Sequence, residues 1–449
     1  MSFRNIRAGR WFRCPNPLSV ATLAIALCIA APAFAQDRMP RRPYRGLFGG
    51  NSNPNRQLSF QWSGVGVYDD NVTEGTSRYD PRYQKSGTYG LIGSGLSFNM
   101  RSGRDSLLTI TARGTTRYFS DLQEFDLLEA GGVIGYSTTF GRTVKLALIQ
   151  GFSYQPFYQL DFLGATLPVI TTTDDGVEAT PQSPDSRDVP LTSLDSQQFS
   201  GAVTVSRSLG RRSSIAAGFS YRLTNFADNS RPFFWREVGA DFSHSLDQYI
   251  ALRLGYHYGL QQDDINVDLP ATVNQNVDIG LVYGRPISRS RRTHVNFSSG
   301  SSIVNYLNKQ YFVVTGDAGL RRELGRTWNA GLTYHRGVQF VEGLTGPLQA
   351  DSVEARLAGL VSRRFDVWMS GGYSNGQLGL GSTGTGYDTF LVGTGVRYAF
   401  ARTLSFQAEY QYYMYDFAQT ARLPTGVPST VNRNSVRIGL TGWLPLLGR

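Results

Sequence analysis

The sequence predicts an all-β protein: a transmembrane antiparallel β-barrel of about eighteen strands, with both termini in the periplasm. Three observations predict this class. The composition is that of half-apolar strands, long segments alternate with period two, and the links between them sort into short and long.

The composition excludes a helical membrane protein and is unusual for a set of soluble domains. The 449 residues include 50 Gly, 24 Tyr and 26 Phe but only 2 Cys, and the mean hydropathy is −0.25. Outside the N-terminus no apolar stretch is long enough for a spanning helix. Strands with one apolar and one polar face keep the mean hydropathy low, as in membrane barrels.

The N-terminus has the pattern of a secretory signal peptide. Four arginines precede the apolar segment 18–30, and a small-residue cleavage site follows at 33–35. We therefore expect a cleaved signal peptide at 1–35, a flexible periplasmic lead-in at 36–57 and the barrel at 58–449. Removing the four arginines lowers the formal net charge from +10 to +6. Cys14 and Cys28 leave with the signal peptide, so we expect no disulfide or thiol chemistry.

Alternation is clearest in the segment 249–261. Ile250, Leu252 and Leu254 occupy one face, whereas Arg253 and His257 lie on the other. Strands of soluble proteins are usually about five or six residues long, and these segments are roughly twice that length. Tilted strands that cross a bilayer need this length.

The same pattern recurs along the chain and predicts eighteen strands. They are 58–69, 86–100, 106–119, 126–140, 143–157, 196–209, 213–227, 233–246, 249–262, 272–286, 292–306, 310–323, 327–340, 350–362, 366–377, 387–400, 403–416 and 433–445.

The links between these strands predict which side each end faces. Every even-numbered strand is followed by a tight link, and most odd-numbered strands by a longer one, the longest being 158–195 and 417–432. Short periplasmic turns and long outer loops are typical of outer-membrane barrels. The short turns are rich in arginine, which accounts for the positive charge without nucleic acid. These arginines either meet anionic lipid headgroups at the inner interface or are simply solvated. The expected partners of the barrel as a whole are outer-membrane lipid and lipopolysaccharide.

A barrel of this size encloses a lumen too wide for side chains to fill. Thirteen charged residues are predicted to face it, because their alternate neighbours are apolar and charges facing lipid are costly. They are Arg113, Arg117, Arg222, Arg253, His257, Asp278, Asp317, Arg321, Glu354, Arg356, Arg397, Glu409 and Arg437. They form either a path for a polar solute or a hydrated wall without selectivity.

The long link after the fifth strand is acidic and is a candidate constriction loop. Its position resembles that of the constriction loop in trimeric general porins, and folding into the lumen would set up a transverse field. Its prolines favour the alternative, an exposed loop. The acidic candidates are Asp161, Asp174, Asp175, Glu178, Asp185 and Asp188.

No pattern of catalytic or cofactor-binding residues is present. The histidines His244, His257, His294 and His335 lie on four different predicted strands without metal-ligand spacing. Nucleophile-elbow and phosphate-loop motifs are missing from the sequence. We therefore predict neither an enzyme nor a cofactor or metal site.

The opening strand, Phe60–Val72 (FQWSGVGVYDDNV), resembles the start of the β-barrel porin 2 family, whose first strand often ends in a Tyr-Asp-x-Asn-like segment. Members of that family are linked to exopolysaccharide production. The resemblance therefore implies an outer-membrane channel for saccharide polymer, with a periplasmic export protein as a further partner. The alternatives are a general diffusion porin for small hydrophilic solutes and a structural or adhesive barrel with a closed lumen.

Overall fold

The computed structural model places the described residues within one compact unit, Pro43–Arg449. The predicted signal peptide and most of the lead-in lie outside the described residues. The structure describes residues 56–71, 86–102, 105–119, 127–141, 143–156, 171–173, 176–178, 195–227, 232–247, 250–263, 271–283, 293–325, 327–341, 344, 346–380, 385–418 and 429–447.

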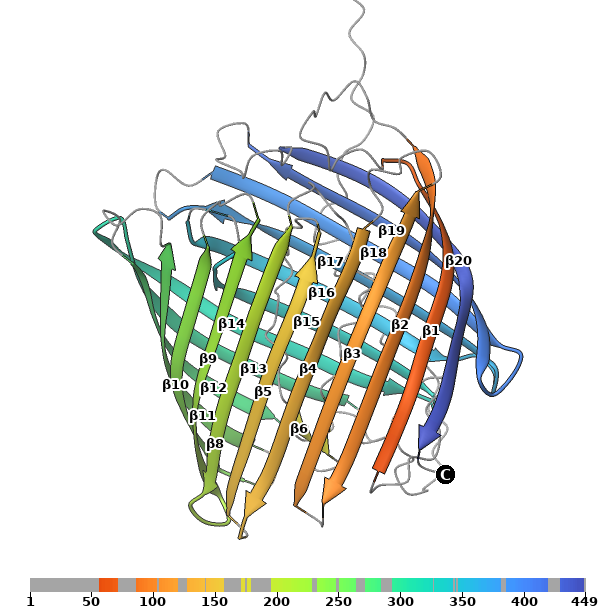
Figure 1. The fold of residues 1–449 in the computed structure, drawn as a ribbon. Coiled ribbons are helices and arrows are strands. Elements are labelled where there is room, and N and C mark those ends of the chain that lie inside the picture. Colours follow the sequence, from red (N-terminus) through yellow and green to blue (C-terminus); the bar gives the residue numbers. More distant parts are fainter. Residues whose placement is uncertain are drawn as a thin grey trace, which may run out of the picture. The chain divides into compact units, whose positions relative to one another are not determined.

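Eighteen long strands form a single antiparallel sheet, and a two-stranded hairpin, β6 and β7, adds two short ones (Figure 1). The strands are β1 Arg56–Asp69, β2 Gly87–Ser102, β3 Ser106–Phe119, β4 Leu127–Phe140, β5 Val144–Gln155, β6 Thr171–Thr173, β7 Gly176–Glu178, β8 Ser196–Ser208, β9 Ser213–Phe226, β10 Phe233–Ser245, β11 Ile250–Asp263, β12 Thr272–Tyr283, β13 Thr293–Tyr306, β14 Lys309–Leu324, β15 Trp328–Gln339, β16 Leu348–Leu360, β17 Phe365–Leu378, β18 Thr385–Ala399, β19 Leu404–Phe417 and β20 Thr430–Leu447.

The sheet closes on itself. Each long strand pairs with the long strands before and after it, and the last strand, β20, pairs with β1 from Leu58–Leu447 to Asp69–Ser435. Closure leaves no edge of unpaired backbone groups, which lipid could not satisfy. The predicted count of eighteen is confirmed, and no predicted boundary differs from the observed one by more than three residues. The hairpin β6–β7 was not predicted.

The start of β1 and the end of β20 lie at the same end of the barrel, which we call the terminal end; the opposite end is the loop end. Links at the terminal end are short, such as 141–143 between β4 and β5, except for 284–292 between β12 and β13. Links at the loop end are mostly longer, and 156–195 is the longest. One exception is the two-residue turn Leu307–Asn308, whose residues both have a positive φ, 51° and 59°. The predicted sorting of links therefore holds with two exceptions, the short turn Leu307–Asn308 at the loop end and the longer link 284–292 at the terminal end.

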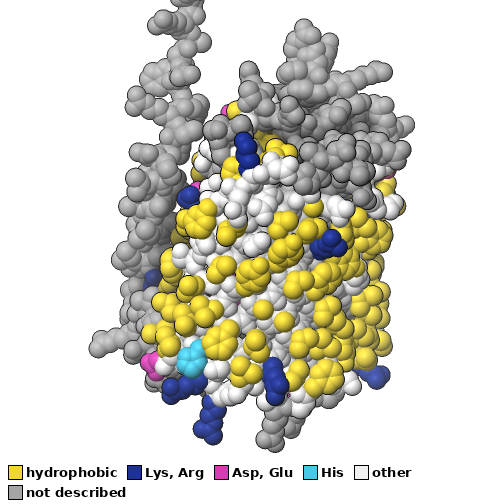
Figure 2. Space-filling view, turned by 90° about the vertical axis from the view of Figure 1, so that its left-hand side faces the viewer, with side chains coloured by type: hydrophobic (Ala, Val, Ile, Leu, Met, Phe, Trp, Pro, Cys, Tyr) yellow, Lys and Arg dark blue, Asp and Glu magenta, His cyan; other side chains and the backbone are white. Residues whose placement is uncertain are grey.

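The outer surface of the barrel is apolar. Cross-strand partners share a face, so the pair Leu254 and Ile279, 40% and 56% exposed, marks one face of β11 and β12 as outward. Figure 2 shows hydrophobic side chains spread over the side of the barrel. Such a surface is unfavourable in water and is covered by lipid. Among the described residues, no helix is long and apolar enough to span a membrane.

Tyrosines near the loop end mark one boundary of this apolar surface. Each lies on the outward face and donates its hydroxyl to a polar group on the next strand, one step closer to the loop end. The pairs are Tyr334 with Asp351 at 2.6 Å, Tyr373 with Asp388 at 2.7 Å and Tyr410 with Asn434 at 2.7 Å. Aromatic girdles with a polar tip are expected where lipid tails meet headgroups.

Inward-facing side chains form a packed core in the half of the barrel nearest the loop end. On β1 to β3 the cluster consists of Val65, Val67, Tyr89, Leu91 and Phe119, with the rings of Tyr89 and Phe119 4.7 Å apart. Two further buried clusters lie mainly on β13, β14 and β16 to β20, and the larger of them has eleven members. The lumen is therefore narrowed on the loop side rather than lined by water-exposed groups throughout.

Candidate functional site

The strand register places all thirteen predicted lumen residues on the face opposite the outward apolar side chains. For example, Arg113 and Arg117 on β3 alternate with the exposed Ile110 and Tyr118. The register puts the others inward in the same way, from Arg222 on β9 to Arg437 on β20. Their accessibility differs, however: Arg117 and Arg437 are buried, whereas Arg253 and Arg356 are exposed to the lumen.

Ion pairs explain why several of these arginines are withdrawn from the lumen. Arg117 on β3 bonds to Glu129 on β4 at 2.8 Å, and Arg397 on β18 bonds to Asp366 on β17 at 2.5 Å. Buried charges need such partners, because removing them from water is costly. These pairs hold neighbouring strands together, which makes their arginines structural groups.

A group of accessible charges lies on the wall formed by β10, β11 and β12. Arg253 on β11 lies 3.1 Å from Asp241 on β10 and 3.6 Å from Asp278 on β12. The ring of His257, four residues from Arg253 on the same face of β11, lies 3.5 Å from both Glu237 and Asp241 and 3.8 Å from Asp278. We call these five residues the β10–β12 cluster. With three carboxylates against one arginine and one histidine, it gives this wall acidic character.

Glycines on the same wall provide the space for this cluster. A Cβ atom at Gly255 would lie 2.9 Å from Oδ1 of Asp241 and would also contact the carboxylate of Asp278. A Cβ atom at Gly239 would meet the ring of His257. Only glycine at these positions lets the side chains from three strands converge over the sheet.

A second accessible group continues the acidic wall on β13 to β15. His335 on β15 lies 2.6 Å from Asp317 on β14, and the hydroxyl of Ser298 on β13 donates to the same carboxylate at 3.3 Å. Both the histidine and the aspartate are about half exposed. Asp317 was predicted to face the lumen, whereas His335 was noted only as a histidine without metal-ligand spacing.

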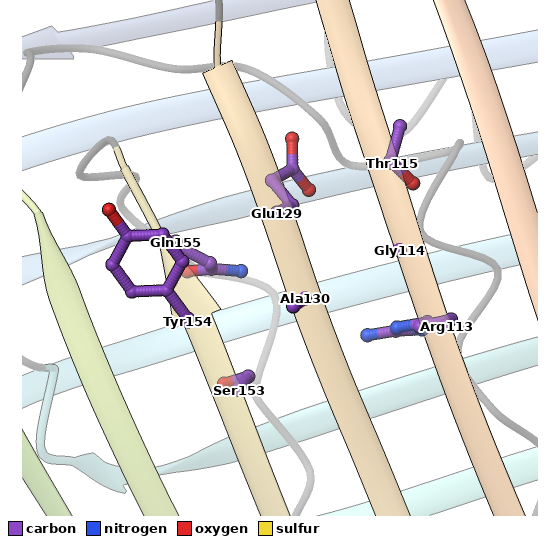
Figure 3. A pocket seen from close by; sticks show the side chains of 8 residues that line it. All are labelled: Arg113, Gly114, Thr115, Glu129, Ala130, Ser153, Tyr154 and Gln155. Carbon is purple, nitrogen blue, oxygen red and sulfur yellow. The ribbon is translucent and has the colours of Figure 1, made fainter.

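On the other side of the barrel, basic and acidic groups surround a recess over β3, β4 and β5. Arg113, Glu129 and Gln155 are among its lining residues, one from each strand (Figure 3). In this part of the wall the arginines Arg113 and Arg117 face the single acid Glu129 on the neighbouring strand. The wall of β3 and β4 is therefore more basic than that of β10 to β14.

The described residues of the link between β15 and β16, namely 340, 341, 344, 346 and 347, contact strands on other parts of the barrel wall. Phe340 stacks on Trp235 of β10 at a centroid distance of 4.5 Å, although β10 and β15 are five strands apart in the sheet. Val341 and Leu344 belong to a buried cluster that also contains Phe226 of β9 and residues of β16 to β20. We call these described residues of the link the crossing loop, and their contacts narrow the loop half of the lumen.

The acidic link 158–195 was the predicted constriction loop. Asp161, Asp174, Asp175, Asp185 and Asp188 lie outside the described residues, and of Glu178 only the backbone is described, at the end of β7. Folding of this segment into the lumen therefore stays a prediction. The crossing loop was not anticipated, because its contacts join residues far apart in the sequence.

The structure brings together histidines and acids that the sequence analysis treated as isolated. The acidic neighbours of His257 come from the two flanking strands, β10 and β12, so no sequence spacing reveals them. Glu237 and Asp241 were missed, although alternation along β10 places both on the face opposite the exposed Val238. His244 faces outward and contacts the hydroxyl of Ser213 at 2.8 Å.

No protein-family model and no curated protein matches the sequence. Solved structures similar to this chain include OpdQ of Pseudomonas aeruginosa, at 13% identity and a TM-score of 0.44, covering 87% of this chain and 98% of that one. OccK2 (OpdF) of Pseudomonas aeruginosa, in complex with glucuronate, has 9% identity and a TM-score of 0.47 over 89% and 100%. OccAB3 of Acinetobacter baumannii has 10% identity and a TM-score of 0.45 over 87% and 99%. At this identity the likeness says nothing about a solute.

Proposed function

We propose that the protein is an outer-membrane channel for the passive passage of small hydrophilic solutes. The observation that carries this proposal is a closed sheet, apolar outside, whose lumen wall presents accessible charged groups on β10 to β15. Side chains alone do not fill a barrel of this strand number, so water occupies the remaining space. Charged groups that face this water can bind and orient polar solutes.

The distribution of charge supports selection among such solutes. The β10–β12 cluster and Asp317 make one wall acidic, whereas Arg113 lies on the facing side of the barrel. A solute that crosses the lumen between them passes through a transverse field, which favours dipolar or charged molecules over apolar ones.

The crossing loop favours small solutes over a polymer. The stacking of Phe340 on Trp235 narrows the passage in the loop half of the lumen. A saccharide polymer could pass only if the contact between Phe340 and Trp235 stayed open for as long as the polymer was in the lumen. The exopolysaccharide channel implied by the family resemblance is therefore the second hypothesis, and the saccharide polymer and periplasmic export protein are partners only under it.

The expected lipid partner has support of its own. Beyond the tyrosine boundary the outward face becomes polar, as shown by Arg336 and Asp351, whose charged groups lie 3.4 Å apart. We propose that lipopolysaccharide headgroups cover this polar band, because their phosphates and sugars match such side chains better than lipid tails do.

Reconstitution tests the channel directly. The protein, purified from membranes in detergent, is inserted into planar bilayers for conductance and into liposomes for swelling with sugars of increasing size. We expect stepwise currents and a swelling rate that falls steeply with solute size. A folded barrel that conducts no ions and passes no sugar would contradict the proposal. Loss of secreted polysaccharide on deletion of the gene would favour the second hypothesis.

The acidic character of the wall can be tested in the same bilayers. Replacing Asp241 and Asp317 by Asn removes two acidic charges from the wall, so the reversal potential in a salt gradient should shift toward anions. The matched control is Asp351→Asn, because Asp351 faces outward and should leave the reversal potential unchanged. An equal shift in both variants would contradict the assignment of the acidic wall.

A further inference from the structure

We propose that Asp241, His257 and Asp278 form a binding site for a divalent transition-metal ion, such as Zn²⁺, on the lumen wall. The three side chains come from β10, β11 and β12, and one ligand atom of each lies within 4.8 Å of the other two. The site is a property of the folded barrel and does not depend on the proposed channel function.

The distances suit a common metal ion. Nε2 of His257 lies 3.5 Å from Oδ1 of Asp241 and 3.8 Å from Oδ1 of Asp278. Zinc binds imidazole nitrogen and carboxylate oxygen at about 2.0–2.2 Å. Ligand atoms around one ion are then roughly 3–4 Å apart, so small side-chain rotations complete the site.

The second ring nitrogen of His257 has the neighbour that a metal-binding histidine usually has. Nδ1 lies 3.5 Å from the carboxylate of Glu237. A carboxylate at this nitrogen holds its proton and leaves the lone pair of the other nitrogen directed at the metal. Glu237 therefore acts as a positioning residue, not as a ligand, in this arrangement.

The glycine pattern is an independent observation that points to the same place. Gly255 lies opposite both carboxylates, and a Cβ atom there would stand 2.9 Å from Oδ1 of Asp241 and contact Asp278. Gly239 leaves room for the ring of His257. The three ligand atoms can converge over the sheet because these two positions carry no side chain.

Arg253 is the competing cation at this site. Its guanidinium lies 3.1 Å from Asp241 and 3.6 Å from Asp278, and nearly half of its side chain is exposed. A metal ion must displace the guanidinium from these carboxylates toward the lumen water. Removal of this positive charge should therefore strengthen metal binding, which is the opposite of what removal of a ligand does.

The ligand set selects the class of ion. An imidazole nitrogen with carboxylate oxygens suits Zn²⁺, Ni²⁺ or Cu²⁺, whereas Mg²⁺ and Ca²⁺ prefer oxygen ligands alone. The three side chains are 15–31% exposed, so an ion can reach them from the lumen.

Titration calorimetry of the detergent-purified, full-length protein with ZnCl₂ and with MgCl₂ tests the site. We expect one Zn²⁺ per chain, bound more tightly than Mg²⁺. His257→Gln and Asp278→Asn should weaken Zn²⁺ binding at least tenfold, and Arg253→Gln should tighten it. The matched control is His335→Gln, since His335 is the other lumen histidine beside an aspartate; its Zn²⁺ affinity should equal that of the wild type.

Three results would overturn the inference: no Zn²⁺ binding by the wild type, unchanged binding by His257→Gln, or a loss of binding in His335→Gln. Tighter binding by Arg253→Gln cannot result from misfolding, so this variant keeps the test valid if a ligand variant is unstable. Calorimetry needs no transport, which separates failure of the site from failure of the channel. If the protein does conduct, Zn²⁺ should reduce the current in the wild type but not in His257→Gln.

Discussion

The carboxylate of Asp69 makes three polar contacts at the loop end of β1. It accepts the backbone N–H of Asn71 at 3.0 Å, accepts Nε of Arg433 at 2.7 Å, and forms an ion pair with the other end of the same guanidinium. The next residue, Asp70, accepts both the backbone N–H and the side-chain amide of Asn434 at 2.6 Å. These residues join the first strand to the last, where the barrel closes.

Replacing Asp69 by Asn should therefore destabilise the barrel strongly. Arg433 is almost fully buried and would lose the carboxylate that balances its charge, which typically costs about 3–5 kcal/mol. The measurement is the free energy of unfolding in urea for the protein in lipid vesicles. The control is Glu354→Gln, because the Glu354–Arg356 pair is at the lumen surface and should contribute less than about 1 kcal/mol. Similar losses in both variants would contradict the closing role of Asp69.

A substitution at Leu307, by contrast, should stabilise the protein. It occupies the first position of a two-residue turn with a φ of 51°, in the left-handed region that branched side chains avoid. Two-residue hairpins of this type favour Asn and Gly at both positions. Leu307→Asn should stabilise the protein by about 1 kcal/mol, because the left-handed conformation costs an ordinary residue about that much. Asn308→Leu, measured by the same urea titration, should be destabilising; a stabilising effect would show that the turn conformation does not control stability.

At the scale of strands, alternation along the chain predicts where the strands lie and which of their residues face outward. Each strand carries its own pattern, such as Val436, Ile438 and Leu440 outward on β20, so its position can be found without knowing its neighbours. The structural role of a short motif cannot be found in this way, because it depends on residues elsewhere in the chain. The segment Tyr68–Asn71 indicated only a family resemblance, and its role at the closure depends on Arg433 and Asn434, more than 360 residues away.

Loops are predicted less well than strands because their contacts are not periodic. The 158–195 segment is acidic, so its composition alone makes it a candidate constriction loop. The crossing loop has no such composition, and its position depends on where Trp235, Phe340 and Phe226 meet in space. Of the β10–β12 cluster, Arg253, His257 and Asp278 were predicted to face the lumen, but their contacts were not. Alternation gives the face on which each residue lies, but it does not give the cross-strand neighbours.

The crossing loop makes a prediction about conductance. Phe340→Ala removes the ring that stacks on Trp235, so the passage in the loop half should widen and the single-channel conductance should rise. Loss of the stacked pair should also cost about 0.5–1.5 kcal/mol of stability beyond the lost area. The control is Phe312→Ala, an aromatic truncation on the lipid face of β14 that is 68% exposed. Its conductance should equal that of the wild type, and a rise in both variants would contradict a constriction at Phe340.

At the scale of the whole molecule, the fold follows from a sheet whose two faces meet different solvents. The charged clusters on β10 to β15 lie on the inner face, and exposed apolar side chains such as Val238 and Ile279 lie on the outer face. Closure satisfies the backbone of every strand at the same time. The same division places charge only where water is present.

Two adjacent residues of β8 test this division. Val203 is 39% exposed and faces outward near the middle of the strand, whereas the next residue, Thr204, is also exposed but faces the lumen. Arginine at position 203 must enter lipid and should lower the free energy of unfolding in vesicles by about 2–4 kcal/mol, whereas arginine at 204 remains in water and should cost much less. If only the exposed fraction of the side chain mattered, the two variants would lose the same free energy of unfolding. A similar loss at both positions, or a larger one for Thr204→Arg, would therefore show that the outer face of this barrel does not contact lipid.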